Sequence, residues 1–140
     1  MGMMGMKKVT ENVYISLVEV DDVEKLIPFL GADVQLVRAE CYEQVAFAAV
    51  LALRSFQRGT NHARTPGGEL LLRLAGSLQI KEAIRKHGAA NGDNYLVVFG
   101  DEGKALEVME RFGLREKPMP SCRGDVLKNL LEKAALVEVL

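Results

Sequence analysis

The chain has 140 residues, a length typical of one domain, and its 49% hydrophobic and 26% charged residues exclude a polypeptide that is disordered throughout. Its formal net charge of −1 argues against a general nucleic-acid coat protein. We predict a flexible N-terminal tail over residues 1–12 and a single domain over residues 13–140.

The first part of the chain predicts a strand, a short helix and a second strand. The β-branched, apolar run Val13–Val20 is typical of a strand. Asp21 and Asp22 can cap the helix that follows, and Gly31 can end it. The imperfect alternation of apolar and polar residues over Val34–Ala39 indicates the second strand.

The segment Tyr42–Gln57 predicts the helix that organises the domain. It is rich in alanine and apolar around nearly its whole circumference. A helix of that kind has to be covered on several sides, so we expect it between the sheet and the other helices. Its longest uninterrupted apolar run, Val45–Leu53, is well short of the roughly 18 residues that a membrane span requires.

The middle of the chain predicts a polar loop, Arg58–Thr65, followed by two helices. Thr65 can cap the first helix, with Pro66 in the first turn, where a missing N–H costs nothing, and with Gly76 at the end. The second helix is predicted over Ile80–His87. We assign its buried side to its apolar residues, which are Ile80, Ala83 and Ile84.

The last third predicts a strand and two more helices. Tyr95–Phe99 is typical of a buried strand, and Asp101 can cap a helix that ends near Phe112. The last helix covers roughly Gly124–Ala134, and we interpret the apolar end, Leu136–Leu140, as a final strand. This order predicts an α/β (α+β) fold: a single layered domain in which a mixed β-sheet of about four strands is packed with helices around the Ala-rich helix.

The sequence contains no nucleophile elbow, dinucleotide-binding fingerprint or paired-histidine metal motif. Phe99–Ala105 resembles a phosphate-binding loop only superficially, because Ala105 stands where Ser or Thr would bind magnesium, and we interpret it as a turn and a helix cap. Cys41 and Cys122 indicate neither a zinc site nor a disulfide framework, which fits a protein of the reducing cytoplasm. We expect a protein without catalytic activity, cofactor or metal, and keep an enzyme that uses Cys122 as an alternative.

Charge is distributed unevenly along the chain. Between Arg54 and His87 there are seven basic and two acidic residues, which give a net charge of +5, and both histidines lie in this window. The remaining 11 basic and 17 acidic residues give −6. The middle of the chain is therefore basic, whereas its two ends are acidic.

The stretch Arg58–Gly88 combines flexible hydrogen-bond donors in its loop with basic residues at helical spacing. Lys81 and Arg85 are four residues apart and share one helix face. Guanidinium and amide donors beside an open loop suit phosphates and exposed base edges. Composition alone leaves open the alternative of a solvated basic face that has no partner.

This stretch resembles the small kinase-binding regulatory subunit of the KEOPS complex, in its archaeal form. The matching motifs are N-x-x-R-T, E-L-L, L-A-G, Q-I-x-x-A-I and a closing glycine, which stand at Asn61–Thr65, Glu69–Leu71, Leu74–Gly76, Gln79–Ile84 and Gly88. The resemblance extends over roughly Val13–Phe99 and is looser in the C-terminal third. It departs at Gln44 and Val45, where the family often has a His-Leu pair.

The resemblance implies a non-catalytic subunit that binds and stimulates the small kinase/ATPase of the complex. It also implies that the subunit holds the single-stranded 3′ CCA end of tRNA while the adenosine next to the anticodon is threonylcarbamoylated. Single-stranded bases expose faces and edges that a duplex hides.

Carried onto this sequence, the tRNA contacts are predicted among the donors of the stretch: Asn61, His62, Arg64, Thr65, Arg73, Gln79, Lys81 and Arg85. The kinase contacts are predicted at the apolar C-terminal end: Val137, Val139 and Leu140. The alternative from another class is a regulatory domain that binds a small molecule, with an anionic metabolite in the Arg58–Thr65 loop.

Overall fold

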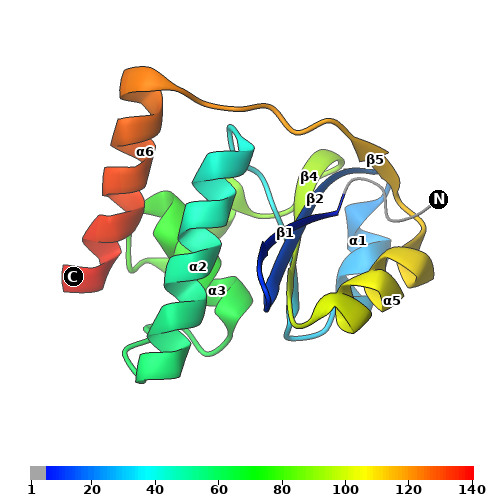
Figure 1. Ribbon diagram of the computed structural model, residues 1–140, viewed down its shortest axis with the longest axis horizontal. Coiled ribbons are helices and arrows are strands. Elements are labelled where there is room, and N and C mark those ends of the chain that lie inside the picture. Colours follow the sequence, from blue (N-terminus) through cyan, green and yellow to red (C-terminus); the bar gives the residue numbers. More distant parts are fainter. Residues whose placement is uncertain (1–5) are drawn as a thin grey trace.

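The computed structural model describes residues 6–140, which form one five-stranded sheet with helices on both faces (Figure 1). Strands lie side by side in the order β1 (Lys7–Thr10), β2 (Val13–Val20), β4 (Gly92–Phe99) and β3 (Val34–Val37). β5 (Arg115–Lys117) also pairs with β2, and all of these pairings are antiparallel. The predicted α/β class is confirmed, with five antiparallel strands in place of a mixed sheet of about four.

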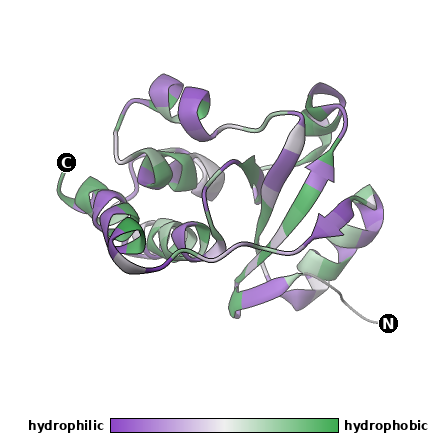
Figure 2. Ribbon diagram, turned by 90° about the horizontal axis from the view of Figure 1, so that it is seen from above, coloured by the Kyte–Doolittle hydropathy of each residue, from purple (hydrophilic) through white to green (hydrophobic). Residues whose placement is uncertain are grey.

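Helices cover the two faces of the sheet unequally, as Figure 1 shows. One face carries α2 (Tyr42–Arg58), α3 (Pro66–Ala75) and α6 (Gly124–Leu136). The other carries α1 (Val23–Leu26) and α5 (Glu102–Phe112). Neighbouring residues of β2 point to opposite layers, Ile15 to the first and Tyr14 to the second. Because both faces are buried, the two central strands β2 and β4 are largely apolar, and Figure 2 shows hydrophobic and hydrophilic residues alternating along the helices that cover them.

The central position predicted for the Ala-rich helix is confirmed. α2 contacts the sheet, α3 and α6, and Val45, Ala48 and Ala52 have no exposed surface. One side of α2 is less completely covered, because it forms with α6 and β1 an apolar groove of about 460 Å³ that includes Phe47 and Leu131. None of the helices in the described part of the chain is long and apolar enough to cross a membrane.

Local helix caps were predicted correctly at two of three positions. The Thr65 hydroxyl accepts a backbone N–H of the first turn of α3 at 3.0 Å, and the Asp101 carboxylate accepts one from α5 at 2.9 Å. Asp22 makes no capping bond with its side chain. The Val23 N–H donates instead to the side-chain oxygen of Asn91 at 2.8 Å. A distant side chain thus replaces the local cap, which sequence proximity does not reveal.

The two ends of the domain differ from expectation. β1 lies inside the predicted flexible tail and pairs with β2, while residues 1–5 of that tail lie outside the described residues. The predicted strand Leu136–Leu140 is wrong. α6 runs to Leu136, and the 3₁₀ helix η2 (Val137–Val139) follows it. The apolar residues that suggested a strand instead end a helix of the α2–α3–α6 layer, where Val137 is fully buried.

The cysteines form a disulfide, which overturns the expectation of no disulfide framework and, with it, the argument from the cysteines for a reducing cytoplasm. Cys41 and Cys122 are joined with their Cα atoms 5.6 Å apart, although 81 positions separate them in the sequence. Backbone contacts bring them together: the Tyr42 N–H donates to the Pro120 carbonyl at 2.9 Å, and the Cys122 N–H donates to the Glu43 carboxylate at 3.0 Å. The chain between α5 and α6 crosses from one face of the sheet to the other (Figure 1), so only the fold makes the pair possible.

Candidate functional site

The polar loop that follows α2 is held in shape by the buried carboxylate of Glu69. One Glu69 oxygen accepts the backbone N–H of His62 at 2.7 Å and that of Ala63 at 2.8 Å. The other oxygen lies 3.2 Å from Nδ1 of the His62 ring. The Asn61 amide donates to the Ala63 carbonyl at 2.9 Å, and Gly59 ends α2 in the left-handed region, with φ 74°. The loop is therefore an ordered structure.

A second buried charged residue, Arg73, contacts the Glu69 carboxylate from within α3. Arg73, one turn after Glu69 on α3, is fully buried and donates to the second Glu69 oxygen at 3.3 and 3.4 Å. Burial by itself would raise the pKa of Glu69. The N–H groups of Ala63 and His62, the His62 ring and the Arg73 guanidinium outweigh burial and hold that pKa below its usual range. Glu69 is thus charged at neutral pH.

Arg73 also reaches the C-terminal end of the domain. Its Nη1 donates to the Glu138 carboxylate on η2 at 2.8 Å. With a side chain that has no exposed surface, Arg73 is not accessible to a tRNA, so its place among the predicted RNA contacts is wrong. Val137 is also fully buried and cannot belong to a docking surface in this fold. Its neighbours Val139 and Leu140 are exposed by 78% and 52%.

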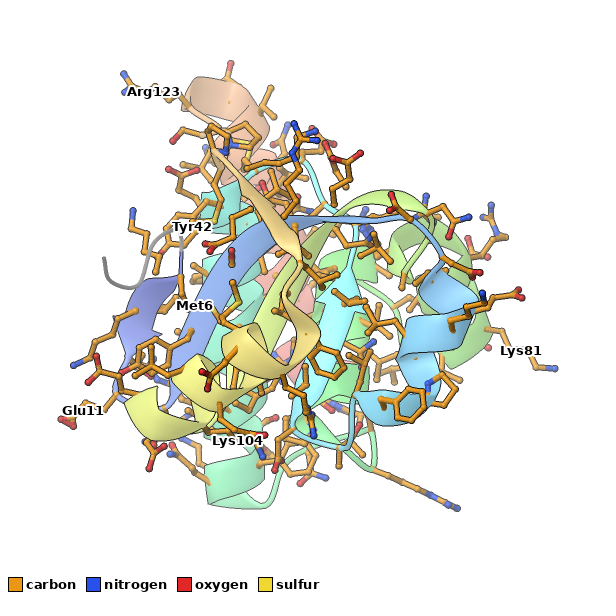
Figure 3. The ribbon with its side chains drawn as sticks, turned by 90° about the vertical axis from the view of Figure 1, so that its right-hand side faces the viewer. Met6, Glu11, Tyr42, Lys81, Lys104 and Arg123 are labelled. Carbon is orange, nitrogen blue, oxygen red and sulfur yellow. A yellow bond between two sulfur atoms is a disulfide. The ribbon has the colours of Figure 1, made fainter. Side chains whose placement is uncertain are left out.

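The helix α4 (Ile80–His87) presents the other predicted RNA contacts to solvent. It is fastened at its C-terminal end by Arg38, which donates through its side chain to the carbonyls of Gly88 at 2.6 Å and Arg85 at 3.1 Å. His87 Nδ1 lies 2.8 Å from the Arg38 carbonyl, and burial lowers the pKa of His87. Lys81 projects outward from this helix in Figure 3.

The exposed side of α4 is apolar as well as basic. Of the three residues assigned to its buried side, only Ala83 is buried, whereas Ile80 and Ile84 are exposed by 42% and 51%. Arg85 is paired with Glu82 at the surface, its Nε 3.2 Å from that carboxylate. Lys81 and Gln79 are exposed and make no side-chain hydrogen bond among the described residues.

Apart from the buried Arg73, the predicted RNA contacts fall into two groups at opposite ends of α3. Asn61, His62, Arg64 and Thr65 precede this helix, and three others follow it on and before α4: Gln79, Lys81 and Arg85. A helix of ten residues separates the groups by about 15 Å along its axis. The sequence did not indicate the residue that organises the first group, since Glu69 was matched only as part of a motif. An acidic residue in the first turn of a predicted helix, four to eight residues after the donors of the loop, was the available signal.

The candidates for chemistry other than binding are a metal site, the segment Phe99–Ala105 and Cys122. They contain no cluster of three or more His, Cys, Asp or Glu side chains with the geometry of a metal site. The interpretation of Phe99–Ala105 as a turn and helix cap is confirmed, because Asp101 caps α5 and Lys104 pairs with Asp33 at 3.0 Å. The Cys122 sulfur is part of the disulfide and is not available as a nucleophile.

Fold and site together define a small α/β domain with an ordered donor-rich loop and an exposed basic helix. No protein-family model matches the chain. A protein of Pyrococcus abyssi (strain GE5 / Orsay), named KEOPS complex subunit Cgi121, is 41% identical over 123 residues, which cover 86% of this chain and 72% of that protein. The chain belongs to the Cgi121 family of KEOPS complex subunits, in agreement with the resemblance found in its motifs.

The departure of this chain from the family's motif has a structural explanation within the domain. Gln44, which stands where the family often has histidine, is buried at the start of α2. Its side-chain oxygen accepts the Glu40 N–H at 2.8 Å. In this chain, the position serves to close the turn before the central helix.

Proposed function

We propose that the protein is a non-catalytic regulatory subunit of a KEOPS complex that holds the 3′ CCA end of tRNA and docks onto the small kinase/ATPase of that complex in the cytoplasm. Membership of the Cgi121 family supports a role in tRNA modification with the KEOPS complex. The chain itself contributes binding groups, and the threonylcarbamoylation of the adenosine next to the anticodon takes place on other subunits.

The observation that carries the RNA-binding part is the ordered loop in front of α3. Glu69 engages two backbone N–H groups and the His62 ring, so the backbone of the loop is fixed. Arg64 is exposed and makes no hydrogen bond or ion pair within residues 6–140. A fixed loop that presents a free guanidinium loses little conformational entropy when it binds a phosphate. Arg64 is therefore the central RNA contact of the first group.

The second group extends the RNA surface to α4. Lys81 and Arg85 supply positive charge, Gln79 supplies an amide, and the neighbouring Ile80 and Ile84 supply apolar surface for unstacked bases. Proteins hold single strands with positive charge along the backbone and side chains that pack against the bases, and here the packing would be aliphatic because α4 has no Phe, Tyr or Trp. An RNA strand that runs along α3 would reach both groups.

Docking of the kinase is assigned to the C-terminal end of the domain. Val139 and Leu140 are exposed there together with Leu136, which is 50% exposed. Three exposed apolar side chains beside the charged Glu138 have the character of a small interface with apolar anchors in a polar rim. α6, which leads to this end, also lines the apolar groove against α2, so a kinase lying along α6 would cover both surfaces.

The alternative, a small anionic metabolite in the Arg58–Thr65 loop, uses the same donors. It predicts a compact site that involves the loop alone and leaves α4 without a role. The exposed position of Lys81, at the far end of α3 from the loop, favours the extended ligand (Figure 3).

tRNA binding tests the proposal directly. Arg64→Ala and Lys81→Glu should each weaken binding of full-length tRNA to the isolated subunit by about 5- to 30-fold, since a contact to a charged group is worth roughly 1–2 kcal/mol. Wild-type affinity should fall steeply with added salt because phosphate binding releases counterions. Removal of the CCA end should abolish most of the binding, as measured by filter binding or fluorescence anisotropy.

Val139→Asp is the matched control. It places a charge on the proposed docking surface, so it should reduce capture of the kinase and leave the tRNA affinity of the isolated subunit unchanged. Binding that does not depend on salt, or that persists in full after CCA removal, contradicts the proposal. Loss of tRNA binding in Lys81→Glu also excludes the metabolite alternative, which gives α4 no part.

A further inference from the structure

A continuous chain of charged groups joins the RNA loop to the C-terminal end. It begins at the backbone N–H groups of His62 and Ala63, passes through Glu69 and Arg73, and ends at Glu138. The two inner members have no exposed surface, and the Glu138 side chain is 40% exposed. Residues 65 positions apart in the sequence are thereby held in one network.

The Glu69 carboxylate is shared between two sets of donors, the loop backbone and Arg73, and Arg73 is shared between the carboxylates of Glu69 and Glu138. Arg73 makes its short contact, 2.8 Å, with Glu138, and its contacts with Glu69 are longer, 3.3 and 3.4 Å. Glu69 in turn makes its short contacts, 2.7 and 2.8 Å, with the loop backbone. A buried guanidinium requires charge compensation, so Arg73 would draw the Glu69 carboxylate away from the loop if Glu138 were removed.

The outer member of this network of charged groups, Glu138, lies within the exposed apolar surface at the C-terminal end. Val137 is buried and anchors η2, while Glu138 stands between it and Val139, which is 78% exposed. A protein that covers Leu136, Val139 and Leu140 must therefore contact the residues on both sides of Glu138. Such a partner would fix the position of η2 and with it the Arg73–Glu138 pair.

We propose that Glu69 and Arg73 are positioning residues that couple the C-terminal docking surface to the RNA loop, so that a protein docked at the C-terminal end strengthens the grip of the loop on RNA. The inference rests on the proposed function for the identity of the two ligands. The contacts of the network are present whatever the two ligands are. Because coupling free energy is reciprocal, RNA in the loop strengthens docking by the same factor.

The coupling is tested with Glu138→Gln, which keeps the size of the side chain and removes its charge. Glu132→Gln is the matched control, because Glu132 is exposed on α6 and forms no ion pair within the described residues. In the isolated subunit, the backbone amides of His62 and Ala63 should exchange with deuterium at least about 5-fold faster in Glu138→Gln, and at the wild-type rate in Glu132→Gln. The measurement needs neither tRNA nor kinase.

The second arm measures tRNA affinity with and without saturating kinase. The kinase should raise the affinity of the wild-type subunit by about 5-fold or more, the lower end of ordinary allosteric coupling, and the ratio should fall towards one in Glu138→Gln. Unchanged exchange of both loop amides, or an unchanged affinity ratio in that variant, overturns the coupling. If the wild-type subunit binds no tRNA, the proposed function fails, and the exchange experiment still decides whether the network holds the loop.

Discussion

The two ends of α3 carry similar donor groups but hold them in different ways. At the N-terminal end, a buried carboxylate fixes the loop through its backbone, and a buried guanidinium backs that carboxylate. At the C-terminal end, Gly76 ends α3 ahead of α4, whose basic side chains lie at the surface, with Arg85 and Lys86 paired with Glu82, and Lys81 without an ion pair among the described residues. In the first region, buried charges fix the loop itself, whereas in the second Arg38 fixes only the C-terminal end of the helix that carries the side chains.

The difference shows how a small domain can present one ligand with both a fixed and an adaptable surface. The fixed loop provides geometry, because its backbone has few alternative positions. The exposed helix provides charge, which attracts a polyanion over a longer distance and tolerates variation in its path. The price is that the fixed end depends on buried charges, which a single substitution can leave unpaired.

The largest effect is expected from Glu69→Ala. It leaves Arg73 buried without its inner partner and removes the acceptor of two loop N–H groups, so the free energy of unfolding should fall by about 3–5 kcal/mol in urea titration. Lys81→Ala at the other end of α3 should stay within about 0.5 kcal/mol of wild type. The double variant Glu69→Ala with Arg73→Met should recover part of the loss. Equal effects of Glu69→Ala and Lys81→Ala would abolish the distinction between the two ends.

A smaller effect is expected from reduction of the Cys41–Cys122 disulfide. Opening this long covalent loop should lower the free energy of unfolding by about 2–4 kcal/mol, measured by urea titration with and without dithiothreitol. The disulfide lies near the start of α6, whereas Glu138 follows the end of α6. Because the bond is distant from the Glu69–Arg73–Glu138 contacts along this helix, reduction should leave the native contacts at both ends of α3 intact. A variant with both cysteines changed to serine should not respond to the reductant. Selective loosening of the RNA loop on reduction would show that its order depends on all of α6.

The smallest effect is expected from pH, at the α4 end. Burial, followed by the charges of Lys133, Arg38 and Lys86, lowers the pKa of His87 in the folded state, despite its hydrogen bond to the Arg38 carbonyl. As the pH falls, His87 is therefore protonated at a higher pH in the unfolded chain than in the folded protein. The contribution of neutral His87 to stability is complete above pH 6.5 and is lost as the pH falls through that value towards the folded pKa. His87→Gln should remove this slope in thermal unfolding between pH 7 and 5, and a slope that persists assigns it to other groups.

Local patterns predicted much of the fold. Val13–Val20, Ile80–His87 and the start of α2 have the bounds that periodicity and breakers indicate, and Thr65 caps its helix as expected. Each of these features depends on neighbours within one turn or one strand. The short strands β1 and β5 were missed because four and three residues carry too little periodicity, and they are stabilised by pairing with β2.

The site was predicted less completely, because composition does not distinguish an exposed cation from a buried one. Arg73 and Arg64 look equivalent in the sequence, yet Arg73 is compensated by two carboxylates, one of them 65 positions away. The C-terminal valines differ in the same way, since Val137 is buried and Val139 is exposed. These distinctions, like the pairing of the cysteines, arise from contacts between distant segments.

The disulfide has a topological consequence for the whole domain. The covalent ring that it closes runs from Cys41 to Cys122 and contains α2, α3, α4, β4, α5 and β5. The residues of both proposed RNA surfaces belong to this ring, whereas α6 and the proposed docking surface follow Cys122 and lie outside it. A single peptide-bond cut anywhere within the ring would leave the polypeptide in one covalently joined piece, with α6 still tethered to the head of α2.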